Sequence, residues 1–220
     1  MIRKVFRIVA IALLVVGVGI FTFPYIAQWI FQLHENQVVV NFNTEVSQVA
    51  QKYPATDQNA PVPYLSDLYA AMQAYNQQIY ANNQADLKDP FSYEEPSFDL
   101  TKWGFKENIV GYIDIPRMSV HLPIYLGATT DNMRHGAVQL SQTSLPIGGV
   151  NTNSVIAAHR GATTGAFFKD IQLLQVGDPV YITNLWTKLT YKVVQTKVIM
   201  PTDIRQVCIQ PGKDMITLIT

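Results

Sequence analysis

The sequence predicts a mainly β domain, a β-barrel or β-sandwich, that follows a membrane anchor and N-terminal helices. The anchor is indicated by the run Ile8–Leu33, 26 residues without one Asp, Glu, Lys, Arg or His. Helices are indicated between Glu35 and Ile79, where apolar residues recur every three or four positions. After Trp103 short apolar runs alternate with Gly and Pro turn signals, a pattern typical of barrels and sandwiches.

The composition excludes several function classes. The 220 residues are 48% hydrophobic and 15% charged, so the chain can bury a core and is not disordered throughout. With 16 basic and 16 acidic residues there is no basic excess, which argues against nucleic-acid binding. The single cysteine, Cys208, excludes an intrachain disulfide and a cysteine-based zinc site. No histidine pair has metal-ligand spacing and no phosphate loop is present, so we expect neither metal nor cofactor.

The uncharged run predicts a single-pass membrane helix. It exceeds the ~20 residues that cross a bilayer, and Arg3, Lys4 and Arg7 precede it. Because basic flanks stay inside, we expect a cytoplasmic N-terminus and an extracellular domain. Without the three basic residues, 13 Lys and Arg face 16 Asp and Glu, a charge of −3 outside. A cleaved signal peptide is the alternative, but no clear cleavage site follows the run.

Two helices are predicted next. The first continues from the anchor to about Tyr53, where prolines begin. The second carries an apolar stripe from Leu65 to Ile79, with Ser66 or Asp67 as the expected cap. Asn82–Pro96 has no periodicity and predicts an exposed loop, either a functional cover or a linker.

The β region is divided by its turn residues. Strands are predicted at Ile109–Ile115, Val120–Tyr125, Ser154–Ala158, Val180–Ile182, Leu189–Ile199 and Met215–Ile219. Helical turns are predicted at Thr130–His135, capped by Thr129 or Thr130, and at Gly165–Leu174. The expected organisation is an anchor region (1–34), juxtamembrane helices (35–84), a lid loop (85–100) and the β-barrel domain (101–220).

Two side chains are candidates for catalysis. His159 ends the apolar strand Ser154–Ala158, and histidine is the usual general acid or base. On these residues alone, a structural histidine that hydrogen-bonds a loop is the favoured interpretation. Cys208 is the one candidate thiol, but its neighbours carry no distinguishing pattern beyond Arg205, which favours a half-buried structural thiol.

Several motifs, taken in order, resemble a known family. They are Gly111–Pro116, His121–Tyr125, Thr143–Gly149, Ser154–Gly161, Gly177–Ile182, Pro211–Asp214 and Thr217–Thr220. Together they resemble class C sortases, the pilin-polymerising cysteine transpeptidases of Gram-positive cell surfaces. The resemblance covers about Leu65–Thr220 and includes the anchor. Asn153, where the family often has histidine, and the stretch 137–139 depart from the family pattern.

The resemblance implies an eight-stranded barrel and a set of site residues. His159 would be the catalytic histidine, Asp89, Pro90 and Phe91 the lid, and Thr217 and Thr220 the residues that flank the nucleophile. The family's cysteine directly follows the Thr-Leu-x-Thr strand, and its arginine lies on the next strand. Both are expected after Thr220, so we expect a C-terminally truncated, incomplete barrel that is inactive alone. Cys208 does not occupy the motif position.

The resemblance also implies partners. The substrates would be pilin subunits with an LPxTG-like sorting signal and an acceptor lysine, handled at the membrane. The alternative is a non-catalytic assembly factor that binds pilin or a full-length sortase at the cell surface. A peptide-cleavage assay and a pilin pull-down separate these two hypotheses.

Overall fold

The computed structural model describes residues 2–55, 57, 59–85, 87, 94–161, 167–200 and 203–220. Its helices are α1 (Ile2–Lys52), α2 (Ser66–Ala81) and α3 (Thr130–His135). Its strands are β1 (Ile109–Ile115), β2 (Val120–Leu126), β3 (Ala137–Gln139), β4 (Thr152–Ala157), β5 (Pro179–Asn184), β6 (Lys188–Lys192) and β7 (Asp214–Ile219). Short 3-10 turns occur at Leu100–Trp103, Pro116–Met118, Ile171–Leu173 and Ile204–Val207.

The strands form one nearly closed barrel. Its seven described strands have the order β6-β5-β1-β2-β3-β4-β7. The β2–β3 and β4–β7 pairs are parallel, and the other pairs are antiparallel. The two outer strands approach each other, because the Tyr191 hydroxyl on β6 donates to Asp214 Oδ1 on β7 over 2.9 Å. The mainly β fold predicted from the turn pattern is therefore confirmed.

Apolar side chains from several strands fill the barrel. Ile113, Ile124, Ile156 and Ile182, from β1, β2, β4 and β5, are fully buried. β4 is buried at all six positions, as expected for a strand covered on both faces. This rigid interior fixes where β4 ends, and with it the position of His159.

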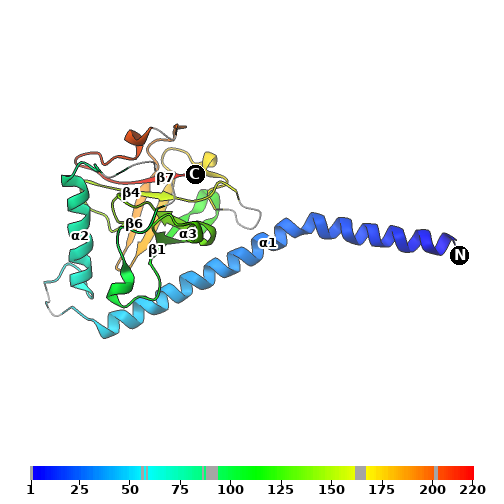
Figure 1. The fold of residues 1–220 in the computed structure, drawn as a ribbon, viewed down its shortest axis with the longest axis horizontal. Coiled ribbons are helices and arrows are strands. Elements are labelled where there is room, and N and C mark those ends of the chain that lie inside the picture. Colours follow the sequence, from blue (N-terminus) through cyan, green and yellow to red (C-terminus); the bar gives the residue numbers. More distant parts are fainter. Residues whose placement is uncertain are drawn as a thin grey trace.

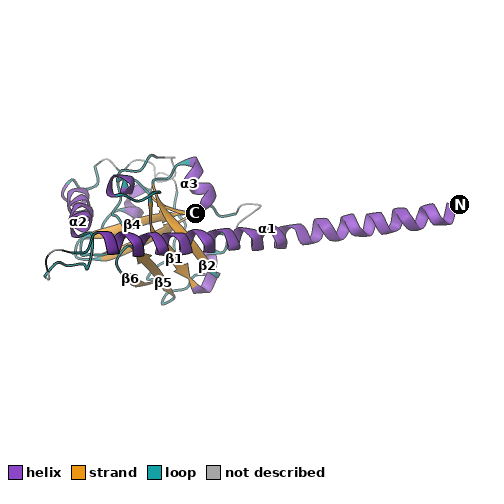
Figure 2. Cartoon of the chain, turned by 90° about the horizontal axis from the view of Figure 1, so that it is seen from below, coloured by secondary structure: helices purple, strands orange, loops and turns teal. Residues whose placement is uncertain are grey.

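Helix α1 combines the predicted anchor and the first juxtamembrane helix in one continuous element. It contains an 18-residue window of mean hydropathy 2.5 with none of it buried, so it is long and apolar enough to cross a membrane. Figures 1 and 2 show its first half extending away from the barrel and its second half lying along β1 and β2. Glu35, Val39, Phe42 and Val49 form the buried face of that second half. The predicted amphipathic continuation and its end near Tyr53 are confirmed.

Helix α2 also matches its prediction, but the predicted cap is wrong. Ser66 is already inside the helix, and the preceding Leu65 has a left-handed φ of 50° with no side-chain cap. The entry to the helix is held instead by Leu65, whose N–H donates to the Tyr53 carbonyl. Asn76 then joins α2 to the barrel, donating to the Leu145 carbonyl (3.1 Å) and accepting from its N–H (2.7 Å).

Three strand and turn predictions need correction. The strand predicted at Leu189–Ile199 ends at Lys192, because β6 is an outer strand with β5 as its one described neighbour. Within the predicted turn Gly165–Leu174, the described part forms a 3-10 turn at Ile171–Leu173. β3 was not predicted, since three residues are too few to show alternation. The Thr130–His135 helix is confirmed, with Thr129 as its cap.

Candidate functional site

The parallel pairing of β4 and β7 brings His159 and Thr220 to the same edge of the barrel. Ala157 is in register with Ile219, and the Ala158 N–H donates to the Ile219 carbonyl over 3.2 Å. His159 follows β4 by two residues, and Thr220 follows β7 by one. The residues that follow the two strands therefore lie at the same edge of the barrel.

The imidazole of His159 makes no hydrogen bond with the described part of the chain. The residue is half-buried, and neither ring nitrogen has a hydrogen-bond partner among the described residues. Its ring contacts Phe167 edge to face, with centroids 6.1 Å apart and planes at 89°. Its carbonyl accepts from the Phe168 N–H (3.0 Å). No described residue therefore blocks either nitrogen from a substrate or a thiol.

Thr217 is placed differently from Thr220. Its hydroxyl donates to Asn153 Oδ1 over 2.9 Å, so it holds β7 to β4 within the barrel wall. Asn153 is fully buried, and its Nδ2 donates to the carbonyls of Val207 (3.0 Å) and Cys208 (3.3 Å). The Asn153 amide therefore ties three segments together. Thr220 is exposed at the edge beside His159.

Cys208 is poorly placed to act with His159. Its carbonyl is bonded to Asn153 near the start of β4, whereas His159 follows the other end of that strand by two residues. The Sγ donates to the Ile204 carbonyl over 3.4 Å. Burial raises the pKa of the thiol, while the nearby Arg205 charge opposes the shift. These contacts favour a structural thiol rather than a nucleophile.

The other histidines lie elsewhere. His121 Nδ1 pairs with the Asp114 carboxylate across the β1–β2 register. His135 Nδ1 lies 2.9 Å from the Asp131 carbonyl oxygen within α3, and His34 is exposed on α1. In the described residues no three of His, Cys, Asp and Glu are grouped as metal ligands would be.

The predicted lid residues Asp89, Pro90 and Phe91 lie outside the described residues. A cavity of about 290 Å³ lies between the C-terminal end of α2 and the segment around Ser97. It is lined by Tyr75, Gln78, Ile79, Asn82, Gln84, Ala85, Ser97 and Gln142, and not by His159. The site near His159 is therefore defined by the strand edge rather than by this cavity.

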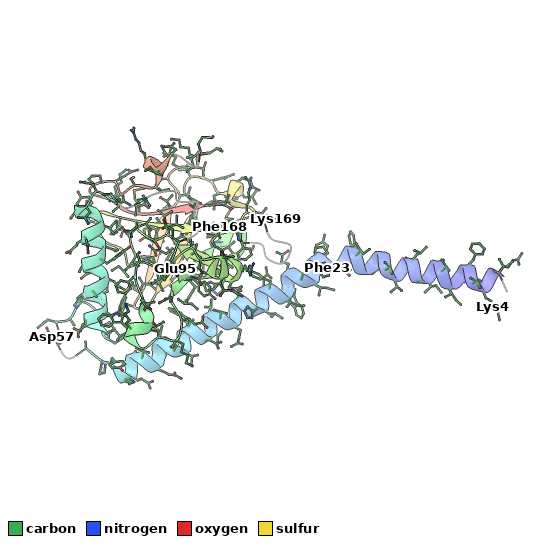
Figure 3. The ribbon with its side chains drawn as sticks, in the orientation of Figure 1. Lys4, Phe23, Asp57, Glu95, Phe168 and Lys169 are labelled. Atoms are coloured by element: carbon green, nitrogen blue, oxygen red, sulfur yellow. The ribbon has the colours of Figure 1, made fainter. Side chains whose placement is uncertain are left out.

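Two aromatic residues at the site were missed by sequence reasoning. Phe167 contacts the His159 ring, and Phe31 of α1 contacts Phe167 with ring centroids 4.9 Å apart. Figure 3 labels the neighbouring Phe168 within the barrel domain and Phe23 on the extended half of α1. No local pattern signals these contacts, because they join segments that are far apart in the sequence.

Three comparisons agree on the type of domain. Residues 113–220 match the family model described as a Sortase domain. Sortase A of Listeria monocytogenes serovar 1/2a is 30% identical over 168 residues, covering 74% of this chain and 73% of that protein. Among solved structures, Sortase C1 of GBS Pilus Island 1 is similar with a TM-score of 0.69 and 29% identity, covering 84% of this chain and 82% of that one. The pilus-related sortase C of Group B Streptococcus has a TM-score of 0.64 and 31% identity, covering 78% and 84%.

Proposed function

The chain belongs to the sortase family and resembles its class C type, and on that premise we propose that it is a pilus-assembly transpeptidase. In this proposal it cleaves an LPxTG-like sorting signal and joins pilin subunits through a lysine side chain. The observation that supports the proposal is the β4–β7 register, in which the strand before His159 and the strand before Thr220 run parallel and end at the same edge.

The reaction proceeds in two balanced acyl transfers. A cysteine thiolate attacks the Thr-Gly carbonyl, the C–N bond breaks, and His159 donates a proton to the departing glycine amine. The resulting thioester is then attacked by a pilin lysine amine. His159 takes one proton from that amine, and the thiolate leaves as the new amide forms. An arginine donor stabilises the oxyanion in both steps.

The proposal assigns the nucleophile to the position directly after Thr220 and the arginine to the following strand. Cys208 is not used, since its carbonyl is bonded to Asn153 near the start of β4 and His159 follows the opposite end of that strand. We accordingly expect the polypeptide of residues 1–220 to be inactive alone. Thr217 holds β7 in register through Asn153, and Thr220 lines the edge at which the sorting signal is attacked.

The remaining assignments concern the surroundings of the site. Asp89, Pro90 and Phe91 act as a lid over it, and residues 1–34, 35–84, 85–100 and 101–220 are the anchor, helical, lid and barrel parts. The N-terminus is cytoplasmic and the barrel extracellular, in agreement with the basic residues before the apolar run of α1.

A thiol-reactivity measurement tests the carrying observation. One cysteine is added after Thr220 in a Cys208→Ala background, and its alkylation rate is followed against pH. A thiol beside a protonated imidazole ionises below the ordinary value of about 8.5, so the profile should lie at lower pH and move up in His159→Ala. Identical profiles with and without His159 would contradict the proposal.

A peptide assay tests the role of the native thiol. We expect no cleavage of an LPxTG-type peptide by the 220-residue polypeptide, with or without Cys208→Ala. Turnover that disappears with Cys208→Ala would show that the nucleophile is misassigned. Specific capture of pilin subunits by a chain whose added cysteine stays unreactive would instead favour a non-catalytic assembly factor.

A further inference from the structure

Among the described residues, the His159 imidazole is in contact with an aromatic ring and has no hydrogen-bond partner. Catalytic histidines are commonly held by a group bonded to the second ring nitrogen. Neither nitrogen has such a partner in the described part of this chain. The described ring contact of His159 is Phe167, at 6.1 Å between centroids and 89° between planes. The orientation of the acid/base therefore depends on where Phe167 is held.

Phe167 is itself held in a defined and strained position. Its side chain is buried, and its φ of 24° is unusual for a residue with a Cβ. The next residue, Phe168, is fully buried and donates its N–H to the His159 carbonyl over 3.0 Å. The segment that carries the aromatic ring is thus fastened to the backbone of His159.

Phe167 also contacts Phe31 of helix α1. The Phe31 ring lies 4.9 Å from the Phe167 ring at 55°, and Phe31 is half-buried. Phe31 belongs to the last turn of the uncharged run Ile8–Leu33. One turn further along α1, Glu35 and Val39 begin the face that packs on the barrel. The contact therefore lies where α1 passes from its extended half onto the domain, as Figure 1 shows.

We propose that Phe167 is a positioning residue for His159, and that Phe31 couples this position to the docking of α1. In this arrangement the helix that anchors the domain also sets the orientation of the site's imidazole. The proposal rests on the proposed function for the role of His159 in proton transfer, but the physical coupling can be measured without catalysis.

The experiment uses the 220-residue chain in detergent micelles with histidine labelled at Cε1. The chain has four histidines, and the resonance of each is followed in Phe167→Leu and Phe31→Leu. We expect the His159 resonance to shift in both variants, because each change removes one ring from the series of contacts that runs from Phe31 through Phe167 to His159. The rate of His159 modification by diethyl pyrocarbonate should rise about two- to tenfold in Phe167→Leu, the range expected for loss of one aromatic pair.

Matched variants separate positioning from general destabilisation. Phe23→Leu makes the same change on the extended half of α1, where Phe23 is 61% exposed, and should leave His159 unchanged. Phe31→Tyr keeps the ring and should restore the original resonance. The His121 resonance reports whether the barrel is folded, because His121 is paired with Asp114 between β1 and β2.

An unshifted, normally protected His159 in folded Phe167→Leu would overturn the positioning role. A shift in Phe167→Leu without one in Phe31→Leu would overturn the link to α1. Where Phe167→Leu does not fold, Phe31→Leu decides: a shift of His159 supports the proposal and no shift overturns it. If the His159 resonance shifts in both variants but His159→Ala leaves the alkylation profile of the added thiol unchanged, the proposed function is refuted and this inference is not. If the alkylation profile depends on His159 but the resonance does not shift, this inference is refuted and the proposed function is not.

Discussion

Glu35 gives the sharpest stability prediction, because it is a buried carboxyl with no hydrogen-bond partner among the described residues. It is 1% exposed on the face of α1 that packs against the barrel. Neither carboxyl oxygen has a hydrogen-bond partner in the described residues. Burial alone raises the pKa of Glu35 from 4.5 to about 8. The charge of Glu35 also acts on Tyr125 of β2. The pKa of Tyr125 is raised mainly by burial and further by the Glu35 charge.

The sign and size of the effect follow from proton linkage. The folded chain binds the Glu35 proton more tightly than the unfolded chain, so this stabilisation is fully present below about pH 4.5 and is lost as the pH rises to about 8. Each pH unit in that window changes the free energy of unfolding by at most ~1.4 kcal/mol. Between about pH 5 and pH 8 the loss is therefore at most ~4 kcal/mol.

The assay compares urea unfolding of the wild-type chain, Glu35→Gln and Glu35→Leu in micelles at several pH values. Tryptophan fluorescence reports on the barrel, since Trp186 donates its indole N–H to the Tyr64 carbonyl over 2.9 Å. We expect the stability advantage of both variants over wild type to grow with pH, and Glu35→Leu to gain most because it removes an unpaired polar group. Glu45→Gln is the matched control, because Glu45 is the other acidic residue of α1 and accepts from the Lys106 N–H.

Parallel stability curves for wild type and Glu35→Gln would refute the reasoning. They would mean that the Glu35 carboxyl is solvated or paired in the folded chain. A Glu35→Leu variant less stable than wild type at about pH 8 would lead to the same conclusion.

Two further substitutions test how the barrel is held together. Asn76→Ala should lower the free energy of unfolding by about 2–4 kcal/mol in urea titrations, since it leaves the buried N–H and carbonyl of Leu145 unpaired. Gln77→Ala, on the exposed side of the same helix, should change it by less than about 0.5 kcal/mol. Gly111→Ala should lower the melting temperature markedly, at a cost of about 1–3 kcal/mol or more, because its Cβ would lie 2.2 Å from the Thr183 carbonyl oxygen. Unchanged stability in either buried variant would contradict the packing described.

Much of the fold was predictable because local patterns and tertiary burial agree. The alternation and turn residues around Ile109–Ile115 locate β1 with its observed bounds, and the apolar stripe from Leu65 locates α2. The cap of α2 was not predictable, because a buried Leu65 bonded to Tyr53 replaced the side-chain cap. The way in which α2 begins depends on the contact between Leu65 and Tyr53 rather than on helix propensity.

A candidate site residue can be located from the sequence where it lies at the end of a patterned strand. His159 is located by the buried run that precedes it, and the parallel register that joins it to Thr220 needed the structure. Asn153 was seen in the sequence as a departure from a family pattern, but its bonds to Val207 and Thr217 could not be derived. Glu35 carried a usable signal, since it shares the spacing of Val39 and the other apolar residues on α1.

Glu35 and Phe31 lie one helical turn apart, so the docking of α1 and the packing beside His159 are parts of one contact. The unpaired carboxyl weakens this contact as Glu35 ionises, whereas the Phe31–Phe167 pair strengthens it. A helix held by hydrophobic packing alone would dock equally well at every pH, because apolar contacts do not titrate. With a carboxyl at position 35, the packing of α1 on the barrel is more favourable at acidic pH than at alkaline pH. On the proposal above, loosening of α1 at Glu35 would reach the Phe31 ring that contacts Phe167.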